Sequence, residues 1–347
     1  MDMPAAISSV IDRKDLARSE MNSVMRLIMT GEATQAQIGG FLVGLRMKGE
    51  TVEEIVGAAQ IMRELATPVE VTGEYLVDTC GTGGSGIAKF NVSTASAFVT
   101  AAAGARVAKH GNRAATSKSG SADLLEEAGA EIMLTPEQVA RCIDTIGVGF
   151  MFAVSHHAAM KHAIGPRKEM VVRTLFNMLG PLTNPARAKR QVMGVYHPSL
   201  VRTAAEVLSQ LGSEHVMVVH SADGLDEISI AGETHVAELK GGVVTEYDIS
   251  PEDFSLKRSS LDLLKVSDPG ESLTLVRGAL DGSVEAASDI VAMNAGAAIY
   301  VSGQALSLEA GVEMAKDAIG AGLASEKMKD FIDFTRQITD DHAGTPG

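Results

Sequence analysis

From Tyr75 onward the sequence repeats one pattern, in which a short apolar stretch runs into a polar or glycine-rich loop and a helical stretch follows. The helical stretches carry common start signals, such as Thr135-Pro136 and Ser199. Strands that alternate with helices predict an α/β fold with a central, mostly parallel sheet flanked by helices. The stretches that we predict as strands are 76–78, 107–108, 148–153, 192–196, 216–220, 227–230 and 236–239.

The first 72 residues carry no strand pattern and are typical of short amphipathic helices. Thr51 and Glu54 have the spacing of a capping box, which marks a helix start. The apolar residues at helical spacing are Leu16, Met21, Val24 and Leu27, then Ile38, Phe41, Leu42 and Leu45, then Ile55, Ala58, Ile61 and Leu65. We therefore predict a helical domain over 1–72, completed by a helical segment around 165–185.

The rest of the chain is predicted as one α/β domain over 73–340, followed by a tail over 341–347. Within this domain the Gly-Pro-rich stretch 180–185 is a candidate hinge or linker, and the Ala- and Gly-rich region 286–324 is predicted as two packed helices.

The composition limits the partners that this chain can bind. Its formal net charge of −14 argues against nucleic acid or an anionic membrane, both of which select basic surfaces. Cys80 and Cys142 are its only cysteines, and without metal-like spacing they are expected to be reduced, buried thiols. Because we find neither a signal-peptide pattern nor an uncharged apolar run of about 18 residues, we expect a cytoplasmic protein.

Two segments after the first predicted strand are suited to phosphate groups. GTGGSG at 81–86 has four glycines in six residues, which lets backbone N–H groups converge on an anion, although a tight strand-to-helix turn would need the same glycines. Asn91-Val92-Ser93-Thr94 begins a helix, whose N-terminus favours anions. An ordinary N-cap by Ser93 or Thr94 is the alternative.

Two later loops carry charged groups of opposite sign. KHGNR at 109–113, followed by hydroxyl-bearing residues at 117–121, indicates an anion site after a strand, the place where α/β sheets commonly bind ligands. Asp226 and Glu227, in DGLDE, suit a hard cation such as Mg²⁺, although an Asp-Gly turn with solvated acids would look the same. Arg167, which we place in a loop, matters only if the fold brings it to a carboxylate.

Taken in their order, these segments resemble the anthranilate phosphoribosyltransferase family over nearly the whole chain. The matching motifs are GTGGSG at 81–86, FNVSTAS at 90–96, KHGNR at 109–113, SKSGSAD at 117–123, RTLFNMLGPLTNP at 173–185 and DGLDE at 223–227. The resemblance implies a helical domain joined to an α/β domain, with the active site between them. It also implies a Mg²⁺-dependent homodimer that pairs mainly through the helical domain.

The implied reaction is transfer of the phosphoribosyl group of phosphoribosyl pyrophosphate to the amine of anthranilate, a step of tryptophan biosynthesis. Catalytic roles would fall to Lys109, His110, Asn112 and Arg167, and anthranilate would lie against Gly81, His110, Asn112 and Arg167. Ser93, Asp226 and Glu227 would serve the metal. The residues implied to bind phosphoribosyl pyrophosphate are Gly81, Thr82, Gly83, Gly84, Ser85, Lys89, Asn91, Val92, Ser93, Thr94, Lys109, His110, Gly111, Asn112, Arg113, Ala114, Ala115, Thr116, Ser117 and Ser121.

Two positions depart from the family pattern, which commonly has Asp at position 85 and Thr or Ser at position 89. Ser85 lowers the repulsion beside a polyanion but removes an acceptor for ribose hydroxyls or metal-bound water. Lys89 is expected either to contact a phosphate or to point into solvent.

Two other functions stay open at this point. A pyrimidine nucleoside phosphorylase has the same plan but would carry DKHSTGG at the first loop. A non-catalytic homologue that binds nucleic acid would need a basic groove, which the charge of −14 opposes.

Overall fold

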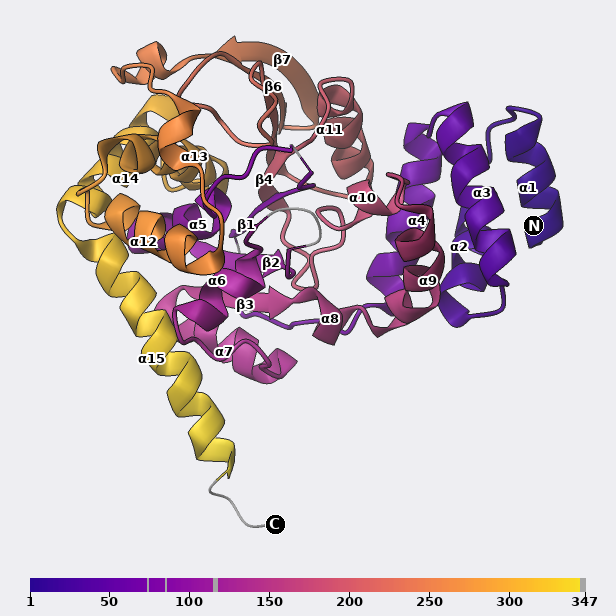
Figure 1. Cartoon of the computed structure of the whole chain (residues 1–347), viewed down its shortest axis with the longest axis horizontal. Helices are drawn as coiled ribbons and strands as arrows, with labels where there is room; N and C mark the ends of the chain where they lie inside the picture. The colour runs from indigo at the N-terminus through magenta and orange to yellow at the C-terminus, as the bar shows by residue number, and fades with distance from the viewer. Residues whose placement is uncertain (74, 85, 115–117, 344–347) are drawn as a thin grey trace.

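The computed structural model describes residues 1–73, 75–84, 86–114 and 118–343. The chain forms a bundle of helices on one side and a twisted sheet covered by helices on the other (Figure 1). This is the predicted fold class, an N-terminal helical unit followed by a larger α/β unit.

The bundle is built from the amphipathic helices that the sequence predicts. The capping box at Thr51 is present, with its side chain accepting from the Glu54 amide at 3.3 Å, and Gly31 ends a helix in the left-handed conformation at φ 82°. The four helices are α1 Met3–Ile11, α2 Arg18–Thr30, α3 Gln35–Lys48 and α4 Val52–Leu65.

The sheet has seven strands in the order β3-β2-β1-β4-β5-β6-β7. The first five strands in this order are parallel, while β6 and β7 continue the sheet as an antiparallel meander. The strands are β1 Leu76–Gly81, β2 Arg106–Gly111, β3 Val148–Phe152, β4 Arg190–Gly194, β5 His215–Ser221, β6 Thr234–Lys240 and β7 Val243–Ile249.

Helices cover both faces of the sheet. Those after β1 are α5 Val92–Ala102, α6 Ser121–Glu127, α7 Pro136–Ile146, α8 Ala153–His156, α9 Lys161–Met170, α10 Phe176–Leu179 and α11 Leu200–Gln210. The C-terminal helices are α12 Pro269–Leu280, α13 Glu285–Ser302, α14 Leu308–Gly320 and α15 Leu323–Ala343, and short 3₁₀ turns lie at Ala158–Met160, Pro251–Phe254 and Leu261–Leu264. The two helices predicted within 286–324 are α13 and α14, which pack on each other.

Successive side chains along a strand point to opposite faces of the sheet, and each face packs into a different apolar core. Val192 and Met217 point into the core formed with α5, α12 and α13, whereas Met193 and Val218 point to the opposite face. The second core continues through α11 into α4 and α2. The helical bundle is therefore fixed to the sheet by a continuous apolar core.

Several sequence expectations need correction. Residues 227–230 form no strand, because Asn294 bonds both the N–H and the C=O of Ile228 and thereby replaces a ladder partner. Lys109 and His110 belong to β2 rather than to a loop after it, and Arg167 lies in helix α9. Helix α15 extends through 341–343, which we had assigned to the tail. Strand β7 was not predicted at all.

The segments around 165–185 connect the bundle to the sheet. Helix α9 packs against α2 and α3, and α10 packs against α4. The proposed hinge differs from an exposed linker, since 181–185 are all buried. The domain boundaries themselves stay a prediction.

Cys80 and Cys142 are both buried free thiols, as predicted. Among the described residues, none of the helices combines the length and apolar character that crossing a membrane would require.

Glu238, buried on β6, makes the stability of the antiparallel end of the sheet depend on pH. Burial opposes its ionisation, but hydrogen bonds from His215, Tyr247 and Tyr300 at 2.7–2.9 Å outweigh this and lower the pKa of Glu238 to about 2. Its contribution to stability is complete above the usual pKa of 4.5 and declines as the pH falls toward 2.

We expect Glu238→Gln to lower the free energy of unfolding by about 2 kcal/mol at pH 7, because a charge-assisted network loses its anion. The difference from the unsubstituted protein should narrow steadily below pH 4.5. Urea unfolding followed by circular dichroism at pH 7, 5 and 3.5 measures it, and a difference that does not change with pH would contradict the assignment.

Candidate functional site

The site lies where the order of the parallel strands reverses direction. Strands β1 and β4 are neighbours, although β2 and β3 come between them in the chain. Their last residues, Gly81 and Gly194, are paired directly. In open α/β sheets this position leaves a crevice at the carboxyl ends of the strands, and ligands bind there.

Glycine at both strand ends makes room for the acidic loop at 223–227. A Cβ on Gly81 would lie 2.6 Å from Asp226 Oδ2, and one on Gly194 would lie 1.7 Å from the Asp226 carbonyl oxygen. Asp226 Oδ2 also accepts a hydrogen bond from the Gly83 amide at 2.9 Å. The glycine loop that begins at Gly81 and the acidic loop at 223–227 therefore meet over the ends of β1 and β4.

A lysine lies on the two carboxylates of this loop. Lys89 Nζ is 2.5 Å from Asp226 Oδ1 and 3.7 Å from Glu227 Oε1. Burial opposes charge on Asp226, but Lys89 and the backbone bonds outweigh it and lower the pKa of Asp226. Burial raises the pKa of Glu227 to about 7 despite the same lysine. The buried Asp226 carboxylate and the partly buried Glu227 carboxylate, with a positive charge beside both, are a donor set that fits a hard divalent cation.

Lys109, on β2, lies between the end of β1 and the start of α5. Its Nζ donates to the Thr79 carbonyl oxygen at 2.5 Å and to Ser93 Oγ at 3.2 Å. Burial lowers the pKa of Lys109, although the charges of Asp78 and Glu227 counteract it. Lys109 therefore joins the end of β1 to the start of α5.

Helix α5 begins beside Lys109. Its N-cap is Asn91, rather than Ser93 or Thr94, and no side chain caps it within the described part of the chain. Asn91 instead binds Ser119 and Ser272 through its side chain, at 2.7 Å for each hydroxyl. The N-terminus of α5 thus lacks a side-chain cap from the described residues, and its dipole is favourable for an anion.

The loop after β2 also contacts the start of α5. Thr94 Oγ1 lies 3.2 Å from Ser121 Oγ, so 119–121 are held against the start of α5. Asn112 is exposed, with its Oδ1 accepting from the Arg113 amide at 2.8 Å. Arg113 is turned toward α6, where it binds Glu126.

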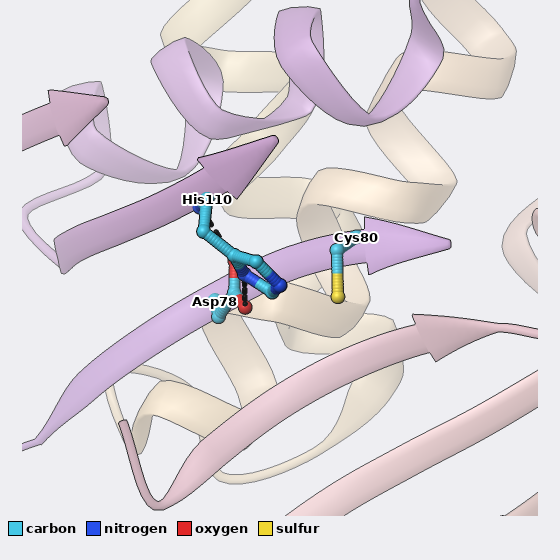
Figure 2. A group of neighbouring side chains, drawn as sticks. All are labelled: Asp78, Cys80 and His110. Carbon is cyan, nitrogen blue, oxygen red and sulfur yellow. Dashed lines mark hydrogen bonds and ion pairs between the residues drawn. The ribbon is translucent and has the colours of Figure 1, made fainter. Parts of the chain in front are cut away.

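Beneath these loops lies a buried polar cluster of Asp78, Cys80 and His110, whose potential ligand atoms are close enough for a metal ion (Figure 2). Every member is already engaged. His110 Nδ1 is 2.6 Å from Asp78 Oδ2 and Nε2 is 2.8 Å from the Gly180 carbonyl oxygen, so both ring nitrogens face acceptors. Cys80 Sγ accepts from Gln191 at 3.0 Å.

Ionisation explains this cluster without a metal. Burial opposes charge on Asp78 and His110, but their attraction outweighs it, lowering the pKa of the aspartate and raising that of the histidine. Burial and the Asp78 charge raise the pKa of Cys80 well above its usual value, so the thiol stays protonated. We interpret the cluster as a buried ion pair that fixes the β1 and β2 ends and the Gly180 backbone.

Arg167 lies on α9, where its guanidinium stacks over the Phe176 ring at 5.3 Å. Burial lowers its pKa, and no carboxylate among the described residues pairs with it. His156 and His157 are buried nearby, and burial with neighbouring positive charge lowers the pKa of His157 to about 4. A partly buried arginine beside an aromatic ring and without an ion-pair partner is suited to an anionic aromatic ligand.

The structure thus brings together Gly81–Gly84, Lys89, the start of α5, Lys109 and Asp226–Glu227. Arg167 packs on Phe176 of α10. Lys89 does not point into solvent, because its ammonium is paired with Asp226, and its contact with a phosphate stays a prediction. Ser85, Ala115, Thr116 and Ser117 lie outside the described residues.

Sequence reasoning missed three contributors. Asp78 and Gly194 sit in strands without a motif, and their roles depend on partners far along the chain. Arg173 binds the Gly84 carbonyl oxygen and stacks over Tyr196 at 4.4 Å. Its place in the segment 173–185 was the one signal that could have found it.

Comparison with known proteins agrees with this architecture. Residues 4–66 match the helical bundle domain of the glycosyl transferase family, and residues 73–325 match its a/b domain. The anthranilate phosphoribosyltransferase of Cellvibrio japonicus is 63% identical over 97% of this chain and 100% of its own length. That of Marinomonas is 63% identical over 97% of this chain and 98% of its own length.

Solved structures share the fold. The Thermus thermophilus anthranilate phosphoribosyltransferase superposes with a TM-score of 0.90 at 42% identity, over 95% of this chain and 99% of its own. The Saccharomyces cerevisiae enzyme, solved in complex with PRPP and Mg, gives a TM-score of 0.87 at 24% identity, over 96% and 98% of the two chains. The predicted resemblance is confirmed, and this chain belongs to the anthranilate phosphoribosyltransferase family.

Proposed function

We propose that this chain transfers the phosphoribosyl group of phosphoribosyl pyrophosphate to the amine of anthranilate, releasing pyrophosphate, as a pentosyl transferase of tryptophan biosynthesis. The observation that carries the proposal is the convergence of the glycine loop, Lys109 and the Asp226–Glu227 pair over the ends of β1 and β4. Such a pocket combines amide donors, ammonium groups and a cation site, as a metal-complexed diphosphate requires.

In this pocket Asp226 and Glu227 would hold Mg²⁺, with Ser93 beside it as the resemblance implies. Bound Mg²⁺ supplies Lewis-acid stabilisation of the negative charge that develops on the departing diphosphate. Lys109 and the N-terminus of α5 contribute further fixed positive charge on the same side. Because these groups are held by strand and helix ends, little reorganisation is needed as the bond to the anomeric carbon breaks.

Arg167 would orient the acceptor by binding the anthranilate carboxylate, with Phe176 supporting the guanidinium. An aromatic amine is neutral at physiological pH, so positioning rather than a strong base governs the reaction. Both nitrogens of His110 face acceptors, and we assign it a positioning role on the Gly180 backbone. Exposed Asn112 is then the better candidate to hydrogen-bond the amine, whose proton is released to solvent.

The decisive experiment is to mix the protein with anthranilate, phosphoribosyl pyrophosphate and Mg²⁺ and to follow the fluorescence of anthranilate. We expect fluorescence to fall, and to stay constant when either phosphoribosyl pyrophosphate or the metal is omitted. Phosphate-dependent cleavage of uridine or thymidine without loss of anthranilate would instead favour the phosphorylase.

We expect Arg167→Ala to raise the KM for anthranilate by roughly tenfold to a hundredfold, the usual cost of losing a charge-assisted pair. The KM for phosphoribosyl pyrophosphate should change little, because Arg167 packs on Phe176, whereas the diphosphate is proposed to bind at the glycine loop and Asp226. Steady-state kinetics with each substrate varied in turn measures both constants, and Lys168→Ala, an exposed neighbour, is the matched control. Equal losses for both substrates would count against the assignment.

We also propose that the protein is a cytoplasmic homodimer that pairs through its helical domain. Large apolar side chains are exposed on this side of the molecule, including Met47 on α3 at 71% and Val171 after α9 at 85%. Val43, Met47 and Val172 line one open hollow here, and exposed apolar groups that lie together are typical of an interface. Light scattering coupled to size-exclusion chromatography measures the mass in solution.

A further inference from the structure

The backbone around Lys89 is fixed by hydrogen bonds to residues 264–266, whereas the Lys89 side chain makes ion pairs with Asp226 and Glu227. On either side of it, the Phe90 amide donates to the Leu264 carbonyl and the Val266 amide donates to the Ala88 carbonyl, at 3.1 Å each. Lys89 itself forms an antiparallel bridge with Lys265. The Lys89 side chain, 15% exposed, then extends to the Asp226–Glu227 pair. The ammonium can therefore leave this pair without moving the chain.

The ammonium lies where a divalent cation would bind. Asp226 presents Oδ1 to Lys89 and Oδ2 to the Gly83 amide, so each of its oxygens already has a partner. Lys89 is the cation that the structure shows on Glu227 as well. A metal ion that binds both carboxylates would lie within a few ångströms of the ammonium, and the two positive charges would repel strongly in this buried place.

We propose that Lys89 is a displaceable counter-cation of the Asp226–Glu227 pair: it neutralises the two carboxylates before a divalent metal arrives and must swing away for the metal to bind. Once released, the ammonium stays tethered beside the glycine loop, where it can bind an oxygen of a diphosphate. Metal binding and diphosphate binding would then support each other, because each favours the displaced position of Lys89. The inference rests on the metal site of the proposed function.

Metal affinity tests the displacement directly. The full chain, without substrates, is titrated with Mn²⁺ and the free ion is followed by electron paramagnetic resonance. We expect Lys89→Met to lower the Kd for Mn²⁺ by about tenfold or more, because a competing positive charge is removed. Lys89→Arg, which keeps the charge, should bind no more tightly than the unsubstituted protein. Lys265→Met is the matched control, since Lys265 is bridged to Lys89 but has an exposed side chain, and its affinity should not change.

Chemical labelling tests the same inference in the unsubstituted protein. Acetylation of Lys89 by a water-soluble anhydride is quantified by mass spectrometry, with exposed Lys265 as the internal reference. We expect Mg²⁺ to increase the labelling of Lys89 severalfold, and excess magnesium pyrophosphate to suppress it again. The proposal would be overturned if Mg²⁺ did not change the labelling of Lys89. It would also be overturned if Lys89→Met bound Mn²⁺ no more tightly than the unsubstituted protein. An increase with metal that pyrophosphate fails to reverse would overturn its second half.

Neither measurement involves anthranilate or turnover. If anthranilate were not consumed while metal affinity and labelling behaved as expected, only the proposed function would fail. If the transferase were active while both readouts stayed flat, only the role of Lys89 would fail.

Discussion

Replacing Gly194 with alanine should lower kcat/KM by roughly a hundredfold, although Gly194 touches no substrate in the proposed complex. The added Cβ would lie 1.7 Å from the Asp226 carbonyl oxygen, closer than the two atoms can approach. Because Gly194 is paired within the parallel sheet, the acidic loop must move instead of the strand. A shift of about 1 Å at Asp226 is enough to cost this factor in a site that works by positioning.

The same substitution should cost about 1–3 kcal/mol in the free energy of unfolding, the usual range for an overpacked core. Gly232→Ala is the matched control, because Gly232 lies between β5 and β6 in the same loop as Asp226, and a Cβ there would meet nothing within 4 Å. Turnover of anthranilate and urea unfolding measure the two effects. Full activity in Gly194→Ala would mean that the position of Asp226 against Gly194 does not matter for catalysis.

Gly194 also shows what could not be predicted from the sequence. Its strand was predicted within two residues, because Val192, Met193 and Val195 are apolar in a run of strand length. The need for glycine arises from Asp226, which lies 32 positions later and reaches β4 only through the fold. No local pattern encodes such a contact, whereas the capping box at Thr51 depends on a residue three positions away and was predicted.

In the candidate site, too, features with a local sequence signal were predicted and contacts between distant residues were not. Its loops were found, because glycines, hydroxyls and paired acids after apolar strands are a local signal. The partner of Lys89 was not found, since a lysine after a glycine loop is equally consistent with phosphate or solvent, and only the coordinates place it on Asp226. Residues 227–230 look like a strand by composition, yet Asn294 on α13 takes the hydrogen bonds of Ile228.

The Asp226 carboxylate should carry the metal dependence of the reaction. We expect Asp226→Asn to lower kcat by roughly a hundredfold to a thousandfold, the range seen when one preorganised electrostatic group is lost. The Mg²⁺ concentration for half-maximal rate should rise, because asparagine keeps an oxygen ligand but contributes no charge. Glu233→Gln, an exposed acid before β6, is the matched control and should leave the Mg²⁺ profile unchanged.

The Mg²⁺ profile separates this role from a merely structural one. Asparagine can still accept the Gly83 hydrogen bond, and Lys89 keeps Glu227 as a partner, so the loop should stay folded in Asp226→Asn. A protein that lost activity only through local unfolding would show a lower melting temperature and a half-saturating Mg²⁺ concentration equal to that of the unsubstituted enzyme. Such a result would remove Asp226 from the metal site, since a ligand cannot lose its charge without changing the affinity for the cation that it holds.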